Sequence, residues 1–559
     1  MKKQFRKVYS FIVLTVVTII IGCGQMEKAD LLIINGNIYS HQAPHLQKLS
    51  IAVKGERILA IGSPEKLNRY KGRFSQVLDV KGALVLPGLT DAHAHIIGLG
   101  KTLNELNLSN TTSAGEIANL VRGGLASATP GEWISGRGWD QNKWADTHFP
   151  AWQDLQGTES HPVYLRRVDG HAAWINRTAL EMARVTRETV DPPGGRIIRD
   201  KNGDPTGVLL DNAIDLVSKV IPPTSFETRL SWAQAAIREC NRYGLTGVHD
   251  AGLDTNSIPV FQELAARGEL SLRLYGMLDG SDSLLLERFF HDGRLGKAGD
   301  RLVIRAVKLY SDGALGSRGA ALLEDYSDDP GNRGLLTTSE DEIYRIAVNA
   351  GRAGFQVCTH AIGDLANRLT LNAYQRALQT VPTTDHRWRI EHAQVVSPED
   401  LPRFSPLGVI PSMQPTHATS DMPWAQRRLG PERIEGAYAW RTLLDLGNRL
   451  PCGSDFPVES PDPRLGLYAA VTRQDTNGNP AKGWYPDQRM TLEEAIRGFT
   501  LDAAYAAFAE EELGSIEPGK LADFTIFDRE LIEDKPESIL NAIVLYTIVG
   551  GEIVYSAIK

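Results

Sequence analysis

Short runs of alternating apolar and polar residues occur at both ends of the chain. Turns rich in Asn and Gly separate these runs, for example Asn35–Gly36–Asn37 and Gly550–Gly551. Alternation with a period of two, broken by such turns, is typical of β-strands in a small sheet. The predicted strands lie at residues 31–34, 51–53, 58–61, 519–527, 542–549 and 553–555. We therefore expect residues 28–86 and 510–559 to form one β-sandwich, with the middle of the chain inserted between them.

In this middle part, strand-like apolar runs alternate with helix-like segments, which is the pattern of βα units in a parallel sheet. Eight predicted strands each end in polar residues, at 89–95, 245–250, 272–278, 303–310, 355–360, 389–392, 409–414 and 450–455. The pattern predicts an α/β fold, a distorted (β/α)8 TIM barrel over residues 87–509. In such a barrel the chemistry takes place at the carboxyl ends of the strands.

A long insertion, residues 98–229, separates the first predicted barrel strand from the second. It contains apolar segments of its own, including Glu132–Asp140 and Pro162–His171. A segment of this length and apolarity is not a bare loop. We expect a lid subdomain that leans over the mouth of the barrel.

Composition and charge narrow the class of partner. The net charge of −8 and the pI near 6.0 exclude nucleic acid as the main partner, since phosphate binding requires a basic surface. A small-molecule substrate fits better, and a homodimer is compatible with the sequence. Beyond the N-terminal segment, Cys240, Cys358 and Cys452 are widely spaced and odd in number, so we expect core packing and no disulfide framework.

The N-terminal segment has a targeting pattern. A basic start at residues 2–7 precedes an apolar run, Phe11–Ile21, that is short for a transmembrane helix. The run ends at Gly22–Cys23 and resembles a bacterial lipobox. It predicts a lipoprotein signal peptide over residues 1–22 and lipidation of Cys23, which would anchor the exported protein on the periplasmic or cell-surface side of a membrane. An ordinary signal peptide and a retained membrane helix are the alternatives.

Residues that bind metal ions gather at the ends of the predicted barrel strands. His93 and His95 alternate on the first strand and so project from the same side. The other members are Lys308 on the fourth strand, His360 on the fifth, His392 on the sixth and Asp455 on the eighth. Neutral imidazole and carboxylate bind Zn²⁺ or a similar divalent ion and leave a position open for water. Bound water loses a proton near pH 7, and a carboxylate then transfers that proton.

These residues resemble a known family. The stretch Asp91–His95, with His360, His392, Asp455 and the C-terminal Glu517–Asp523, is similar to the metal-dependent amidohydrolase superfamily. Several segments resemble the branch that includes the N-substituted formamide deformylases: Gly138–Asp140, Asp169–Asn176, Lys308–Arg318, His360–Asp364 and Gly453–Pro457. The branch resemblance covers the architecture but not the substrate, because branch members act on varied amides.

The resemblance implies a set of ligands. His93 and His95 would bind one metal ion with Asp455 nearby, and His360 and His392 would bind a second. Lys308 matches a lysine that some members carbamylate to bridge the two ions. Alternatively, Lys308 contacts a substrate anion or pairs with Asp312, and the site then holds a single ion.

Other candidates lie outside this set. His171, in the insertion, is a candidate catalytic residue that contacts the substrate or the transition state; structural capping is the alternative. Trp139, Asp140 and Asp312 are candidate substrate-binding residues, although Trp139 is equally typical of a subdomain core. A weaker group comprises His249, Gln414 and His417, and Arg389 and Glu391 are expected to support His392 from beside its strand.

Together these patterns predict a metal-dependent hydrolase of carbon–nitrogen bonds other than peptide bonds. The expected substrate is an amide or N-substituted formamide, with Asp455 as the proton shuttle. Two enzyme alternatives use the same scaffold, namely a deaminase and a hydrolase of cyclic amides. A non-catalytic lipoprotein that binds a small molecule is the alternative from another class.

Overall fold

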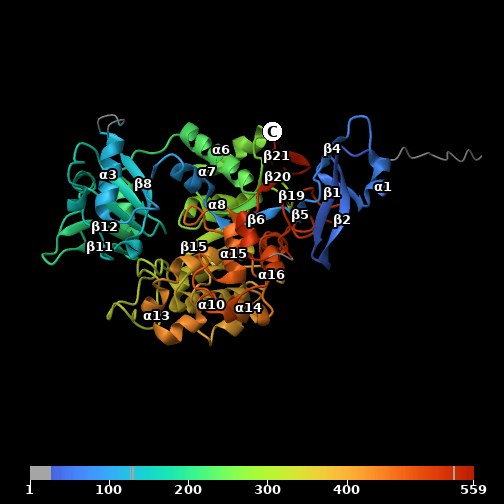
Figure 1. Ribbon diagram of the computed structural model, residues 1–559. Helices are drawn as coiled ribbons and strands as arrows, with labels where there is room; N and C mark the ends of the chain where they lie inside the picture. The colour runs from blue at the N-terminus through green and yellow to red at the C-terminus, as the bar shows by residue number, and fades with distance from the viewer. Residues whose placement is uncertain (1–26, 126–127, 129–130, 533–534, 559) are drawn as a thin grey trace, which may run out of the picture.

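The computed structural model describes residues 27–125, 128, 131–532 and 535–558. The predicted signal peptide and Cys23 lie outside the described residues. Three parts follow one another across the view in Figure 1: the insertion on the left, the barrel in the centre and the N-terminal strands on the right. No helix in the described ranges combines the length and apolar character needed to cross a bilayer.

The barrel sheet is parallel, and its strands are hydrogen-bonded in chain order. The seven strands are β6 (Leu89–Ala94), β13 (Leu245–Leu253), β14 (Arg273–Asp279), β15 (Leu302–Tyr310), β16 (Gln356–Ala361), β17 (Arg389–His392) and β18 (Ile410–Ser412). Almost all their residues are buried, as expected for strands covered on both faces. An α/β fold with a nearly closed parallel barrel is therefore present.

The eighth predicted strand, residues 450–455, is not regular. It forms one isolated bridge, between Cys452 and Met413. It still spans the gap, because the Gly453 amide donates to the Met413 carbonyl at 3.0 Å and the Ala92 amide donates to the Cys452 carbonyl at 3.0 Å. Pro451 has no N–H to donate, which shortens the ladder. The prediction of eight regular strands is thus corrected to seven strands and a bridging segment.

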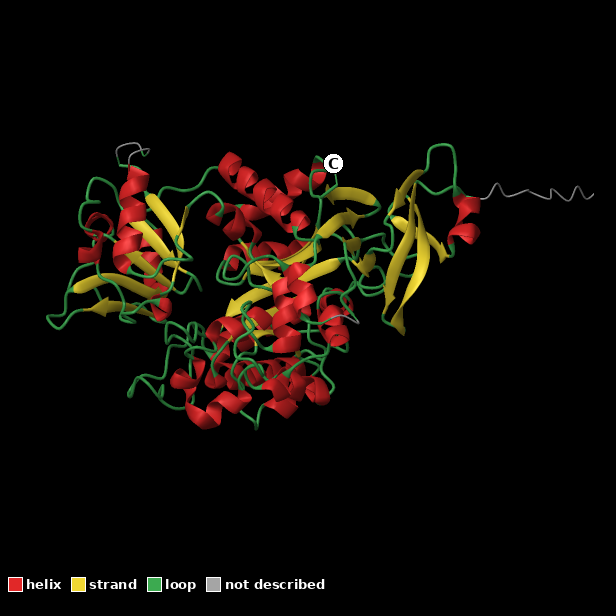
Figure 2. Ribbon diagram, viewed as in Figure 1, coloured by secondary structure: helices red, strands yellow, loops and turns green. Residues whose placement is uncertain are grey.

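Helices cover the outside of the barrel, as Figure 2 shows. The longer ones are α6 (Phe226–Arg242), α7 (Ser257–Ala266), α8 (Ser283–Asp292), α9 (Glu340–Arg352), α10 (Asp364–Thr380) and α15 (Pro463–Thr472). The shorter ones are α2 (Ile96–Thr102), α11 (Phe404–Leu407), α12 (Pro415–Asp421), α13 (Ala425–Arg433), α14 (Trp440–Asp445), α16 (Leu492–Gly498) and α17 (Leu501–Ala506). In α9, Ser339 caps the first turn and Ile343, Ile346 and Ala347 form the buried face, so cap and periodicity fix the helix together.

The two chain ends form one sheet of eight strands. Its strands are β1 (Leu31–Ser40), β2 (Ala43–Lys54), β3 (Arg57–Gly62), β4 (Gln76–Asp79), β5 (Leu84–Pro87), β19 (Phe524–Phe527), β20 (Val544–Val549) and β21 (Glu552–Ser556). β5 pairs with β1 on one side and with β19 on the other. The sheet curls, since the Ile58 amide of β3 donates to the Lys520 carbonyl before β19. The strands therefore share one curled, hydrogen-bonded sheet, in contrast to the two separate sheets of a sandwich. The short helix α1 (Pro64–Leu67) contacts β2 and β3, whereas α18 (Glu537–Asn541) packs against α15 of the barrel.

The insertion has its own six-stranded sheet and core. The strands are β7 (Leu106–Asn107), β8 (Ile134–Trp139), β9 (Val163–Arg167), β10 (Ala172–Ile175), β11 (Gly195–Arg199) and β12 (Pro205–Asp211), with helices α3 (Ala114–Leu125), α4 (Arg177–Met182) and α5 (Asp215–Ser218). Leu165, Trp174 and Val208 are buried together in this core. Such a core can hold residues at the end of the sheet in fixed positions over the barrel.

Candidate metal centre and substrate cavity

Three predicted metal ligands converge where β6 ends. His93 and the next residue but one, His95, are both extended, so their rings project from the same side. Asp455 Oδ1 lies 3.2 Å from His95 Nε2 and 3.6 Å from His93 Nε2. The ligand atoms of these three residues lie within 4.8 Å of one another. The geometry fits three protein ligands on one divalent ion.

Lys308 lies beside this group. Its Nζ atom is 3.2 Å from His93 Nε2, and the side chain is buried. Burial lowers the pKa of Lys308, because the ammonium loses its hydration. Lys308 and Asp312, both in the described part of the chain, form no ion pair. Asp312 instead accepts hydrogen bonds from the backbone amides of Ala321, Ile362 and Gly363, at 2.8 to 3.0 Å. Asp312 thus positions two loops, although it also lines the cavity.

His360 and His392, on neighbouring strands, complete the rim. Their ring centroids are 4.7 Å apart, and the His392 ring is 4.8 Å from that of His93. The Nδ1 atom of His392 is 2.7 Å from Gln414 Oε1, which fixes the orientation of the ring. His360 Nε2 lies 3.4 Å from Asp312 Oδ1. All the predicted metal-binding residues therefore line one chamber. His360, which the sequence pairs with His392 on a second ion, is in neither of the compact groups of possible ligands among the described residues.

His417, which the sequence ranks as a weak candidate, belongs to the centre. It forms a second possible metal-binding group with His392 and Asp455, again within 4.8 Å. Its Nε2 atom is 3.9 Å from Asp455 Oδ2, and it is buried without a hydrogen-bond partner among the described residues. His417 lies on α12, after β18, so the rule of strand ends does not reach it. The one sequence feature that points to His417 is its position three residues after Gln414, the N-cap residue of α12, because residues three apart lie on the same side of a helix.

Glu391 and Arg389 support the centre from below, but through His93 more than through His392. Glu391 Oε2 is 2.5 Å from His93 Nδ1, and Arg389 Nε is 2.7 Å from Glu391 Oε1. Burial alone would raise the pKa of Glu391, yet the charges of Arg389 and His93 lower it below its usual range. An ionised carboxylate on Nδ1 directs Nε2 of His93 toward the cavity and increases its basicity.

The protonation states suit metal binding. Burial, followed by the charge of Lys308, lowers the pKa of His93 to about 4. Burial also lowers the pKa values of His360 and His392. These imidazoles are neutral at pH 7 and have a lone pair available. Burial would raise the pKa of Asp455, but the hydrogen bond from His95 lowers it well below its usual range. The centre therefore presents neutral nitrogen ligands and an ionised oxygen ligand.

Two connected chambers open at this centre. The larger has a volume of about 700 Å³ and is lined by His93, His95 and Lys308. The smaller, of about 390 Å³, is lined by His417 and Trp424. Seven residues border both chambers: Asp169, His171, His360, His392, Asp455, Pro457 and Val458. A small organic molecule fits this space with groups on both sides of the metal centre.

The insertion contributes His171 to this boundary. His171 Nδ1 is 2.7 Å from Asp211 Oδ1, so Asp211 orients the ring and leaves Nε2 free. The ring lies 5.2 Å from that of His360, centroid to centroid. Burial alone would lower the pKa of His171, but the hydrogen bond to Asp211 raises it. The geometry suits a hydrogen bond from the lid to a substrate at the centre.

The other two candidates in the insertion, Asp140 and Trp139, have different surroundings. Asp140 lines the smaller chamber and forms a buried ion pair with Arg167. Trp139 is wrongly predicted as a substrate contact, because its side chain is fully buried in the core of the insertion. Its Nε1 donates to the Leu165 carbonyl at 2.9 Å. Neighbouring side chains on a strand point to opposite faces, so Asp140 faces the cavity while Trp139 faces the core.

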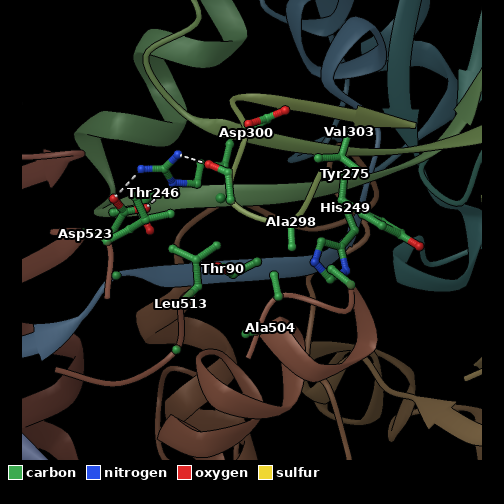
Figure 3. A pocket seen from close by; sticks show the side chains of 18 of the residues that line it. Thr90, Thr246, His249, Tyr275, Ala298, Asp300, Val303, Ala504, Leu513 and Asp523 are labelled. Atoms are coloured by element: carbon green, nitrogen blue, oxygen red, sulfur yellow. Dashed lines mark hydrogen bonds and ion pairs between the residues drawn. The ribbon is translucent and has the colours of Figure 1, made fainter. Parts of the chain in front are cut away.

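His249 does not line the mouth either. It borders a separate cavity of about 40 Å³, near the amino-terminal ends of the barrel strands. Figure 3 shows His249 there with Thr90, Thr246 and Tyr275. Its Nδ1 lies 3.0 Å from Arg389 Nη1. This histidine supports the interior of the barrel. Cys240, Cys358 and Cys452 are likewise buried and free, in agreement with core packing.

Comparison with known proteins places this geometry in a family. The profile of the amidohydrolase family matches residues 76–555, which include the barrel, the insertion and the metal centre. The chain belongs to the amidohydrolase family. As a family member it is an enzyme, a hydrolase, and the metal-binding character of its centre agrees with the family.

This amidohydrolase is similar to other proteins, one of them of known crystal structure, over most of its length. The putative amidohydrolase YtcJ of Bacillus subtilis is 32% identical, with 90% of this chain and 96% of that protein covered. The N-substituted formamide deformylase of Arthrobacter pascens is 27% identical, with 95% and 99% covered. The crystal structure of an uncharacterized metal-dependent hydrolase from Pyrococcus horikoshii has a TM-score of 0.73 at 28% identity, with 90% and 99% covered.

Proposed function

We propose that this amidohydrolase hydrolyses the carbon–nitrogen bond of a small amide, using Zn²⁺ at the rim of the barrel. The observation that carries the proposal is the convergence of His93, His95 and Asp455, from distant segments, on one buried point beside a cavity. The similarity to an N-substituted formamide deformylase supports an amide or N-substituted formamide as the substrate.

The residues fit a divalent ion on chemical grounds. The donor set consists of neutral imidazoles and an ionised carboxylate, which are the ligands of catalytic zinc. The buried Nε2 of His417 has no partner in the described part of the chain, so it is available as a ligand. His93, His95 and Asp455 would hold one ion, and His392 and His417 would share Asp455 on a second. Lys308, whose Nζ lies 3.2 Å from His93 Nε2, would be a further ligand in a carbamylated form.

A divalent ion bound there lowers the pKa of water and polarises a carbonyl group. The chain supplies the proton transfers. Asp455 accepts a proton from the attacking water and returns it to the leaving nitrogen. His171, oriented by Asp211, donates a hydrogen bond from Nε2 to the substrate oxygen as its negative charge develops. The insertion excludes water from the chambers while the substrate is bound.

The test uses the purified protein with a panel of N-substituted formamides and acetamides. We expect hydrolysis that is lost on chelation and restored by Zn²⁺. Asp455→Asn should reduce kcat by about 10²- to 10⁴-fold, the usual contribution of a proton-transfer group. The exposed Asp292→Asn is the matched control and should leave the rate unchanged. Full turnover by the metal-free protein or by Asp455→Asn would refute the proposal.

A further inference from the structure

We propose that the substrate of this amidohydrolase carries a carboxylate, which binds to the paired arginines Arg137 and Arg166 in the larger chamber. The inference rests on the proposed function, because it names the class of amide that is hydrolysed. It identifies a binding site made by residues of the insertion that are not among the proposed metal ligands.

The two arginines lie side by side. Arg137 on β8 and Arg166 on β9 are directly paired in the register of these parallel strands. Both line the larger chamber together with the metal ligands. Neither forms an ion pair with an Asp or Glu in the ranges that the structure describes. The adjacent Arg167 differs, since it pairs with Asp140 and with Asp169, the latter at 2.5 Å.

One edge of each guanidinium is held by the turn that follows β9. Arg137 Nη2 donates to the Val168 carbonyl at 2.9 Å, and Arg166 Nη2 donates to the Gly170 carbonyl. Both groups converge on Gly170, where a Cβ would come 3.0 Å from Arg166 Nη2 and 3.3 Å from Arg137 Nη2. The Nε atoms of both arginines are buried without a hydrogen-bond partner among the described residues. The two side chains are thus oriented with donors to spare.

Charge favours an anion at this point. Burial, and then the charge of Arg166, lowers the pKa of Arg137 to about 10, so Arg137 remains protonated at neutral pH. Two adjacent cations repel each other unless a negative group lies between them. Several carboxylates that line the chamber are engaged elsewhere: Asp211 with His171, Asp254 with Arg229, and Asp250 and Asp312 with backbone amides. The charges of Asp169 and Glu105 act on both arginines, but Asp169 is paired with Arg167 and Glu105 with Lys101. A carboxylate of the substrate matches the planar fork of a guanidinium.

The experiment uses three carboxylates with spacers of increasing length, each with its uncharged carboxamide. The probes are N-acetylglycine, N-acetyl-β-alanine and N-acetyl-4-aminobutyrate. Binding to the metal-loaded protein is measured by calorimetry, and hydrolysis is measured separately. We expect at least one carboxylate to bind about tenfold or more tightly than its carboxamide, as charge-assisted bidentate contacts predict.

Variants test whether the arginines cause this preference. Arg137→Gln and Arg166→Gln should each remove it while leaving carboxamide binding unchanged, and Arg137→Lys should recover part of it. The control is Arg177→Gln, an exposed residue of the insertion that pairs with Glu181 and should keep the full preference.

The outcomes separate this inference from the proposed function. Equal binding of acid and carboxamide, binding of neither, or a preference that survives in both glutamine variants would overturn the arginine site. A preference that depends on the arginines, without hydrolysis of any probe, would retain the site and count against the amide substrate. Hydrolysis of the probes without a preference for the carboxylate would support the amide substrate and count against the arginine site.

Discussion

At the residue scale, the centre depends on contacts that orient each imidazole. His93 is the clearest case: Glu391 binds its Nδ1 atom, and Arg389 holds Glu391 in turn. Gln414 does the same for His392, and Asp211 for His171. His417 presents its Nε2 atom instead: this atom is buried, forms no hydrogen bond among the described residues, and lies 3.9 Å from Asp455 Oδ2. Orientation by these partners makes the centre ready for a metal ion.

Glu391→Gln should therefore weaken zinc binding by about 10- to 100-fold, the usual effect of losing a carboxylate that supports a ligand. The amide keeps the size of the side chain but not its charge, so Arg389 also loses its buried counterion. Zinc affinity is measured by competition with a chromophoric chelator. Glu399→Gln changes an exposed glutamate paired with Arg368 and should leave affinity unchanged. Equal affinities in the two variants would contradict the role of Glu391.

Sequence alone predicts the residues at the strand ends well, because alternation on a strand fixes the side of each residue. His93, His95, His360 and His392 all follow this rule. The rule fails for Trp139, since the alternation does not say which face of β8 is the core. It also misses His417, whose place depends on how α12 packs after β18. The arginine pair could not be predicted either, because it depends on the register between β8 and β9, which cannot be derived from the sequence pattern.

At the element scale, the irregular segment 450–455 is what closes the barrel and brings Asp455 to the centre. Two contacts with β6 hold this segment. The Ser454 hydroxyl donates to Asp91 Oδ2 at 2.6 Å, and the Asp455 amide donates to the His93 carbonyl at 2.7 Å. Asp455 itself has a positive φ of 60°, a strained conformation that these contacts maintain. The periodicity of helices and strands predicts the regular elements around this segment. It does not predict the path of the segment itself, which depends on contacts with the buried Asp91.

Gly453→Ala should disturb this closure. Its Cβ would come 2.6 Å from both Asp91 Oδ1 and the His93 amide, atoms that have no room to move. We expect a loss of about 1 to 3 kcal/mol of stability, typical of overpacking, together with reduced zinc content. Thermal unfolding and metal analysis measure the two effects. Gly115→Ala, on α3 with open space around the new Cβ, is the control and should not lower the unfolding temperature. An unchanged unfolding temperature for Gly453→Ala would count against tight closure here.

At the scale of the whole molecule, three parts meet to form one site. The barrel supplies the metal ligands, the insertion supplies His171 and the arginines, and the shared sheet ties both chain ends to the barrel base (Figure 1). The sequence predicts this division: short alternating strands mark both chain ends, strand-like and helix-like runs alternate in the barrel, and the insertion is the long segment between the first two barrel strands. It does not predict that the terminal strands join in one curled sheet, because β5 pairs across more than four hundred residues with β19.

We propose that the protein is exported and anchored to a membrane by lipid on Cys23, on the periplasmic or cell-surface side. The apolar run that ends at Gly22–Cys23 supports this placement. In a bacterial host supplied with radiolabelled palmitate, the full chain should be labelled and should sediment with membranes. Cys23→Ser should remove both properties, whereas Cys240→Ser, at a buried cysteine, should remove neither. Labelling that persists in Cys23→Ser would contradict the anchor.

The central claim is that separate barrel segments jointly bind a catalytic metal ion. Anomalous diffraction from crystals of the zinc-loaded protein, recorded on both sides of the zinc absorption edge, tests it most directly. The account predicts a zinc peak within bonding distance of His93, His95 and Asp455, and a second peak, when both groups are filled, beside His392 and His417. A zinc-loaded, hydrolytically active crystal with no anomalous peak among these residues would contradict it.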